Sequence, residues 1–144
     1  MQFDPDNKVV QLCAQGIERE AQLKPEEAKE LFLQAWNESI TDFEKFTSAH
    51  YVARHQSSIE EKLQWDITAI ECALRIESEE IKGVYPSLYL NIGKGYEDLG
   101  DNINARKYYQ LANSFMDSLL DDGYGTMIKG GINNGLERVS INKE

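Results

Sequence analysis

The sequence predicts an all-α protein, because apolar side chains recur at steps of three and four residues along most of the chain. The pattern is clearest over residues 85–119, where two apolar stripes are separated by a tight turn at Gly100. Residues that favour helix starts precede several stripes, and Thr41 and Glu44 have the spacing of a capping box. We therefore expect about seven helices in one domain that covers residues 1–144.

Length and charge limit the class of protein. A chain of 144 residues that is 41% hydrophobic is long and apolar enough to fold around a core. Its net charge of -10 argues against nucleic acid and against an anionic membrane surface, because both attract basic proteins. No apolar run reaches the roughly 18 residues of a membrane helix, and the first ten residues lack a signal pattern. We expect a cytoplasmic protein.

Helices over residues 6–22 and 25–38 form the first expected hairpin. Pro25 suits the first position of a helix, and the acidic pair Glu26 and Glu27 favours the positive end of the helix dipole. The side chains expected to face inward are Val10, Cys13, Ala14, Ile17, Ala21, Ala28, Leu31, Phe32, Ala35 and Trp36. Cys13 and the other cysteine, Cys72, each lie alone on an apolar face, so we expect buried, reduced thiols.

The second hairpin is expected over residues 42–76, with helices at 42–56 and 59–76. A capping box precedes each helix, and Ser58 with Glu61 forms the second one. The side chains expected to face inward are Phe43, Phe46, Ala49, Val52, Ala53, Leu63, Ile67, Ile70, Ala73 and Leu74.

The third hairpin is expected over residues 79–119, and two alternatives describe its start. The apolar stripe keeps its phase across Pro86, which favours one kinked helix that begins near Ser78. Alternatively, a short turn precedes a helix that begins near Pro86. Gly100 follows the first helix where a positive φ is needed, and the second helix runs over 102–119.

A loop over residues 120–125 leads to a last helix at 124–139, and residues 140–144 form a tail. Gly131 and Gly135 lie one turn apart, so this helix can approach a neighbour closely. It is expected to cap the apolar face that the third hairpin leaves open.

The third hairpin resembles the tetratricopeptide repeat (TPR), a helix-turn-helix unit of about 34 residues. The residues that carry the resemblance are Tyr89, Ile92, Gly93, Tyr96, Leu99, Gly100, Asp101, Ala105, Tyr109 and Ala112. The first hairpin matches at Gly16, Ala28, Phe32 and Ala35. The middle hairpin departs from the pattern with Arg54 in place of glycine, and Asp117 replaces the closing proline of the third.

The chain is similar to small single-domain bacterial TPR proteins. The resemblance implies three TPR-like hairpins and a C-terminal capping helix, curved into a short right-handed α-solenoid with a concave groove. The groove residues that it implies are Tyr51, Val52, His55, Ser87, Leu90, Asn91, Lys94, Glu97 and Asp98, with Val10, Cys13 and Ile17 from the first helix.

Asn91 and Lys94 are the residue types that TPR grooves use to hold a peptide backbone or a C-terminal carboxylate. The other residues of such a carboxylate clamp are absent from the first and third helices. The alternative is that these polar side chains are simply exposed to solvent.

Few residues indicate catalytic, metal or cofactor chemistry. His50 and His55 are five residues apart, so on a helix they point about 140° apart and do not share a metal ion. The glycines at 123–131 lack the preceding strand and the Gly-Lys-Ser/Thr of a phosphate loop. No motif places a nucleophile beside a base. We therefore expect no catalytic residues, no cofactor and no metal site.

The sequence thus predicts a non-enzymatic protein–protein interaction module, an adaptor or scaffold that binds a peptide or a partner helix in the concave groove. A self-assembling structural protein, such as a homodimer, is one alternative. A small-molecule-binding regulator that uses Tyr51, His55 and Tyr89 is another, and an enzyme is the least expected.

Overall fold

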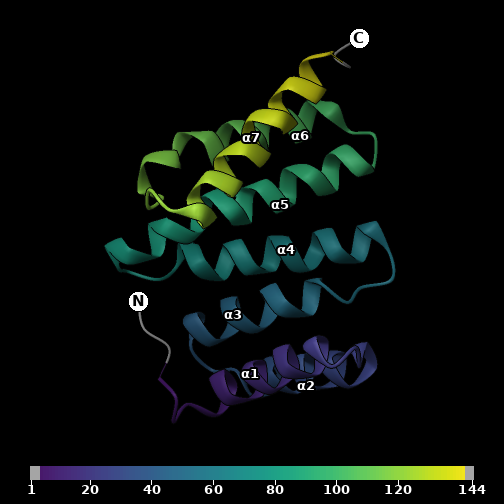
Figure 1. The fold of residues 1–144 in the computed structure, drawn as a ribbon, viewed down its shortest axis with the longest axis vertical. Helices are drawn as coiled ribbons and strands as arrows, with labels where there is room; N and C mark the ends of the chain where they lie inside the picture. Colours follow the sequence, from purple (N-terminus) through teal and green to yellow (C-terminus); the bar gives the residue numbers. More distant parts are fainter. Residues whose placement is uncertain (1–3, 142–144) are drawn as a thin grey trace. The chain divides into compact units, whose positions relative to one another are not determined.

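A computed structural model describes residues 4–141 and confirms the all-α class. These residues contain seven α-helices, two 3-10 helices and no strand. The chain divides into two compact units, one ending at Ile76 and one beginning at Glu77, and each is described by itself (Figure 1). No helix within residues 4–141 has the length and apolar character needed to cross a bilayer.

Unit 1 consists of two helical hairpins. The first joins α1 (Lys8–Ala21) to α2 (Pro25–Glu38), and the second joins α3 (Asp42–Ala53) to α4 (Ile59–Leu74). Each helix packs mainly on its hairpin partner, and α3 also packs on α2 and α1 (Figure 1). The expected helices are thus present, although α1, α3 and α4 are each two or three residues shorter than expected at one or both ends.

Side-chain caps fix where the helices of unit 1 begin. The Asn7 side chain accepts from the Val10 amide at 3.0 Å and starts α1. Thr41 and Glu44 form the predicted capping box at α3. At α4 the Ser58 hydroxyl accepts from the Glu61 amide, but the Glu61 carboxylate accepts from that hydroxyl and not from the backbone. The second capping box is therefore only half formed.

The core of unit 1 centres on Phe32, which is fully buried. A Cβ atom added to Gly16 would lie 2.3 Å from Cε1 of Phe32, so glycine lets α1 approach this ring. The cysteines are both buried, as predicted. Four side chains expected to face inward are exposed instead, because the apolar stripes are wider than the faces that neighbouring helices cover: Ala14, Ile17, Ala21 and Leu74.

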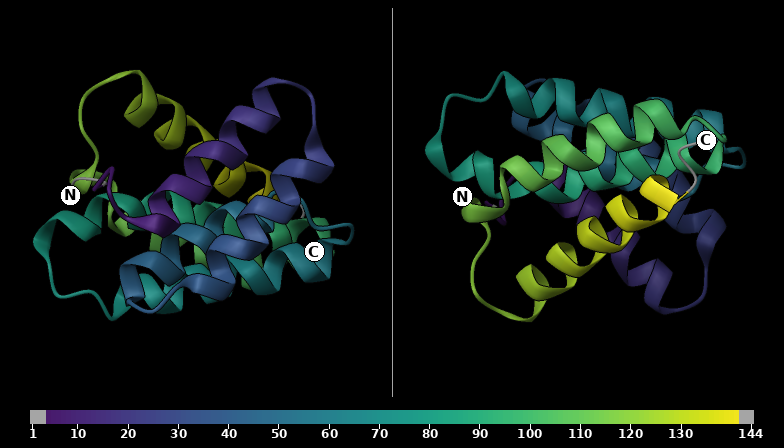
Figure 2. Two further views of the ribbon diagram at one scale, coloured as in Figure 1. Left: turned by 90° about the horizontal axis from the view of Figure 1, so that it is seen from below. Right: turned by 90° about the horizontal axis from the view of Figure 1, so that it is seen from above.

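Unit 2 contains one hairpin and a third α-helix that packs on it. The elements in order are η1 (Glu79–Val84), α5 (Tyr85–Asp98), α6 (Asn102–Ser114), η2 (Met116–Ser118) and α7 (Gly123–Ile141). Helix α5 pairs with α6, and α7 packs on both, crossing the pair at an angle (Figure 2). The expected last helix is therefore present and extends a little further than 124–139.

The preferred alternative for the start of the third hairpin, one kinked α-helix, is wrong. The α-helix begins at Tyr85, and Pro86 lies in its first turn. Backbone N–H groups in a first turn have no carbonyl acceptor within the helix, so the N–H that proline lacks costs no helical hydrogen bond there. The six preceding residues form the 3-10 helix η1. The apolar stripe keeps its phase because Ile81 and Tyr85 are both buried although they belong to different kinds of helix.

The turn between α5 and α6 has the predicted geometry. Gly100 has φ +83°, and the amides of Gly100 and Asp101 donate to the carbonyls of Glu97 and Tyr96 at 2.9 Å each. These two bonds are those of a Schellman motif. The far end of α6 differs from the prediction, because α6 ends at Ser114 and a 3-10 turn replaces its expected last residues.

The core of unit 2 centres on Tyr109, which is fully buried between two glycines. A Cβ atom on Gly93 of α5 would lie 2.6 Å from the Tyr109 ring, and one on Gly135 of α7 would lie 2.7 Å from it. Gly93 and Tyr109 thus repeat the contact between Gly16 and Phe32 in unit 1.

Candidate functional site

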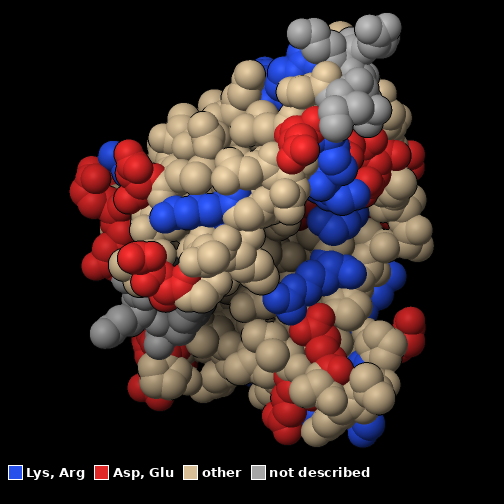
Figure 3. Space-filling view, turned by 45° about the horizontal axis from the view of Figure 1, so that its top comes forward, with Lys and Arg blue, Asp and Glu red and all other residues tan. Residues whose placement is uncertain are grey.

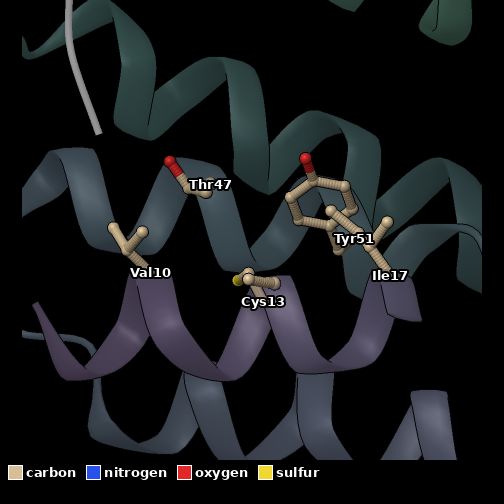
Figure 4. A pocket seen from close by; sticks show the side chains of 6 residues that line it. Val10, Cys13, Ile17, Thr47 and Tyr51 are labelled. Atoms are coloured by element: carbon tan, nitrogen blue, oxygen red, sulfur yellow. The ribbon is translucent and has the colours of Figure 1, made fainter. Parts of the chain in front are cut away.

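A hollow between α1 and α3 is the candidate site in unit 1, and we call it the α1–α3 hollow. It has a volume of about 300 Å³. Val10, Cys13 and Ile17 project from α1 toward α3, which supplies the opposite wall (Figure 4). The full lining is Val10, Cys13, Ala14, Ile17, Thr47 and Tyr51.

Helical periodicity produces both walls of this hollow. On α1 the lining residues recur at steps of three and four, and on α3 Thr47 and Tyr51 are four residues apart. Ala14 has a small side chain, which leaves the space open. Ile17 is 41% exposed at the rim, so no described residue of unit 1 covers this side of the hollow.

The position of Tyr51 is fixed by its neighbours. Its ring stacks on Phe32 with 5.1 Å between the centroids, and the Arg54 guanidinium lies 4.8 Å from the Tyr51 centroid. The aromatic wall is therefore packed on the core of unit 1.

The chemistry of the hollow is apolar and unreactive. Burial raises the pKa of the Cys13 thiol to about 11, so Cys13 stays protonated near neutral pH and is a poor nucleophile. Thr47 Oγ1 is buried and has no hydrogen-bond partner in the structure. None of the described residues that line the hollow is charged. The arrangement suits an uncharged, apolar group.

Tyr51 and His55 both stack on the Phe32 ring, with 5.1 and 5.6 Å between centroids, but His55 lines a different cavity. Its Nε2 atom is 2.7 Å from Oε2 of Glu20, whose other carboxylate oxygen accepts from Arg54 at 2.9 Å. These contacts hold His55 against the end of α1. There it lines a separate cavity of about 430 Å³, with Glu20, Leu23 and Pro25.

In unit 2, α7 covers part of the face of α5 that was expected to line the groove. Leu90 packs in the cluster around Tyr109, and a Cβ atom on Gly131 would lie 3.0 Å from its Cδ2. Glu97 accepts from the Arg138 guanidinium, with 2.8 Å from Nε to Oε2 and 3.0 Å from Nη2 to Oε1.

The Tyr109 hydroxyl also donates to Glu97, at 2.6 Å. The hydrogen bond from Arg138 holds the pKa of the Glu97 carboxyl below its usual range, against the opposing effect of burial. Burial raises the pKa of Tyr109, and the bond to Glu97 raises it further. Glu97 therefore fastens α7 to the α5–α6 hairpin.

The other predicted residues of α5 make local contacts. Lys94 forms an ion pair with Asp98 one turn later. The Ser87 hydroxyl donates to the Val84 carbonyl at 3.1 Å. Asn91 is half-buried. The structure thus brings Tyr51 together with the α1 residues Val10, Cys13 and Ile17, and it keeps the α5 residues within unit 2.

Sequence reasoning missed two polar residues that stand at equivalent positions in the middle hairpin. His50 lies as far before α4 as Gly16 lies before α2 and Gly93 before α6, so His50, not Arg54, replaces the repeat glycine. Asp66 correspondingly takes the place of the buried aromatic ring in α4 and is 2% exposed. The sequence signal for this correspondence is the set of helix starts at residues 25, 59 and 102, because Gly16, His50 and Gly93 lie at the same distance before them.

Both residues have shifted pKa values. Burial lowers the pKa of His50 to about 4, with smaller contributions from Arg54 and Lys62. Burial raises the pKa of Asp66, while the Lys62 ammonium, at 2.7 Å, opposes that shift. His50 Nδ1 has no hydrogen-bond partner in the structure. Within residues 4–141 no three His, Cys, Asp or Glu side chains cluster as metal ligands.

Comparison of the chain with protein families, with characterised proteins and with solved structures gave no match.

Proposed function

We propose that the protein is a protein–protein interaction module that binds apolar side chains of a peptide or partner helix in the α1–α3 hollow. The observation that carries the proposal is an apolar hollow with an aromatic wall packed on the core of unit 1, bordered by the exposed residues Ala14 and Ile17. A TPR-like scaffold is part of the proposal. It is supported by the Gly16–Phe32 contact and its repetition by Gly93 and Tyr109.

The size and shape of the hollow favour a side-chain anchor over a complete small ligand. Ligand cavities typically enclose most of the ligand in about 300–1,000 Å³, and this hollow is at the lower limit and open at its rim. Burial of one Leu or Ile side chain contributes about 1.5–3 kcal/mol. A partner therefore needs further contacts along α1 and α3, as a helix or an extended peptide would make.

Site-specific photo-crosslinking tests the proposal. A benzophenone amino acid at Ala14, on the rim, is expected to crosslink a partner in the native cell, while the same group at Asn37, exposed on α2, does not. Ile17→Asp is expected to abolish the crosslink, because it places a charge at an apolar rim. Because Asn91 and Lys94 lie in unit 2, Asn91→Ala with Lys94→Ala is expected to leave it intact.

Equal crosslinking at both positions, or an Ile17→Asp variant that still crosslinks, would contradict the proposal. A crosslink between two copies of this chain at Ala14 would favour self-assembly.

A further inference from the structure

A second uncovered apolar surface lies in unit 2, at the start of α7. Leu120, Tyr124 and Met127 are 75%, 54% and 62% exposed. Tyr124 and Met127 lie one turn apart on α7, and Leu120, in the loop before it, lines the same cavity as Tyr124. We call these three residues the α7-start patch. Scattered exposed apolar side chains are ordinary on protein surfaces, whereas adjacent ones mark interaction sites.

A cavity of about 340 Å³ adjoins the patch, between η1, η2 and the first turn of α7. Gly125 allows the start of α7 to approach the preceding loop closely, because a Cβ atom on it would lie 2.0 Å from the Leu120 carbonyl oxygen. A Cβ atom on Gly83 of η1 would make only ordinary contact, 3.6 Å from the Ser118 carbonyl oxygen. The adjoining face of α7 is uncovered, because a Cβ atom on Gly123 or Gly130 would meet nothing within 4 Å.

The surroundings of the patch are acidic. The exposed carboxylates on η1, η2 and the loop before α7 are Glu79, Glu80, Asp117, Asp121 and Asp122. The space-filling view shows acidic side chains gathered at its upper left edge, on the side where η1 and η2 lie in Figure 1 (Figure 3). Lys82 is the basic residue of η1, and its ammonium lies 3.2 Å from the Glu79 carboxylate.

Charge decides which kind of partner fits this surface. An anionic lipid headgroup or a nucleic-acid phosphate would be repelled by the carboxylates. A protein segment with apolar side chains on one face and Lys or Arg beside them would bury the patch and meet charges of opposite sign.

We propose that the α7-start patch docks a cationic amphipathic segment of a partner protein, with an apolar side chain in the adjoining cavity. This surface belongs to unit 2 and is independent of the α1–α3 hollow of unit 1. Asp122 has a structural role here, because its carboxylate accepts from the Gly125 amide at 2.7 Å, so Asp122 is left unchanged in the test.

The probe is a synthetic amphipathic helix of Leu and Lys, compared with the same helix in which Glu replaces every Lys. Titration into the ¹⁵N-labelled full-length protein is expected to shift amide signals of residues 79–84 and 116–127 with the Lys peptide only. Fluorescence anisotropy is expected to show weaker binding as the salt concentration rises. Equal binding of the Glu peptide, or shifts confined to other residues, would overturn the proposal.

Matched variants separate this surface from the general acidity of the protein. Glu79→Gln, Asp117→Asn and Asp121→Asn together are expected to weaken binding about tenfold, because each removes an ion pair of modest strength. The control replaces three exposed carboxylates elsewhere, Glu30→Gln, Glu71→Gln and Glu137→Gln, and is expected to leave affinity unchanged. Equal losses in both variants would show attraction by net charge alone and overturn the proposal.

The apolar contribution has its own control. Leu120→Gln with Met127→Gln is expected to weaken binding about tenfold, because apolar side chains at the centre of an interface carry much of its affinity. Ile40→Gln with Ile103→Gln removes two apolar side chains that are 83% and 80% exposed elsewhere and is expected to have no effect. An unchanged affinity in the Leu120 and Met127 variant would overturn the proposal.

Discussion

Tyr109 is the largest fully buried side chain in the described part of the chain, and Phe32 is the next. Each ring lies against a glycine on the preceding helix, so the sequence pattern of glycine and aromatic residue has a direct steric cause. Tyr109 is the more constrained ring, because Gly135 of α7 encloses it from a second helix and Glu97 accepts from its hydroxyl.

A methyl group at Gly93 is therefore expected to destabilise the protein. In Gly93→Ala the new Cβ atom would lie 2.6 Å from a ring that Gly135 prevents from moving away, and such overpacking costs about 1–3 kcal/mol. Gly130→Ala is the control. Its Cβ atom meets nothing within 4 Å, so the better helix propensity of alanine should stabilise α7 by about 0.4–1 kcal/mol. Urea denaturation measures both, and equal effects would contradict the packing argument.

The middle hairpin has polar side chains where the other two hairpins have a glycine and an aromatic ring. His50 and Asp66 occupy these positions. Burial lowers the pKa of His50 and raises that of Asp66, and both shifts favour the neutral form of the side chain. The sequence alone showed that this repeat was degenerate. It did not identify the replacement, although the predicted start of α4 places His50 where Gly16 and Gly93 lie before α2 and α6.

Protonation of His50 is expected to make stability depend on pH. Because the folded-state pKa of about 4 lies below the unfolded value of 6.5, the unfolded chain takes up a proton first as the pH falls. Stability is therefore complete above about pH 7 and decreases by about 2 kcal/mol between pH 7 and pH 5. Over this pH interval the free energy of unfolding of the His50→Gln variant should fall by about 2 kcal/mol less than that of the unmodified protein. Urea denaturation, with His55 retained in both proteins, measures the difference. The same pH dependence in both proteins would contradict this origin.

At the scale of elements, one carboxylate joins the starts of α1 and α3. Glu44 accepts from the Ile40 and Thr41 amides, at 2.8 and 3.1 Å, and from the side chain of Asn7, at 2.8 Å. Asn7 is itself the N-cap of α1. The capping box was evident in the sequence, but the link to Asn7 was not, because it joins residues distant along the chain.

Glu44→Ala is expected to destabilise unit 1 by about 1–2 kcal/mol, because it leaves three donors without this acceptor. The same bonds, that from Asn7 foremost, lower the pKa of Glu44, so its stabilisation is present above the ordinary carboxyl pKa and is lost in acid. Glu38→Ala is the control, because Glu38 is exposed and accepts from Gln34 of its own helix, so its loss should cost less than about 0.5 kcal/mol. The Val10 amide donates to the Asn7 side chain, so its hydrogen exchange should become faster in Glu44→Ala, where Asn7 loses its bond to Glu44. Equal exchange in both variants would contradict the connection between α1 and α3 through Glu44.

Helix starts were more predictable than helix ends. Pro25, Thr41 and Ser58 mark starts through local chemistry, and α2, α3 and α4 begin as expected. The ends of α3, α4 and α6 come earlier than expected, since an apolar stripe can continue into turns and 3-10 helices. The same limit applies to the site. The resemblance to TPR proteins implied Tyr51, Val10, Cys13 and Ile17, which line one hollow. The cover of α7 over Leu90 and Glu97 depends on tertiary packing.

At the scale of the whole molecule, each compact unit has its own core. In unit 1 Phe32, Ala28 and Val52 are packed together, and in unit 2 Tyr109, Ala105 and Val139 are packed together. A core of this kind allows a unit to unfold without the other, and the distribution of tryptophan makes this measurable.

Both tryptophans of the chain, Trp36 and Trp65, lie in unit 1, where their rings meet edge to face with 5.1 Å between centroids. Tryptophan fluorescence therefore reports on unit 1 alone, while far-ultraviolet circular dichroism reports on the helices of both units. If the units unfold independently, Gly93→Ala, which acts in unit 2, should shift part of the dichroism transition to lower urea and leave the fluorescence midpoint unchanged. Gly16→Ala is the matched variant in unit 1, since its Cβ atom would lie 2.3 Å from Phe32, and it should shift the fluorescence midpoint. Coincident shifts of both signals in both variants would instead mean that the two cores unfold as one cooperative unit.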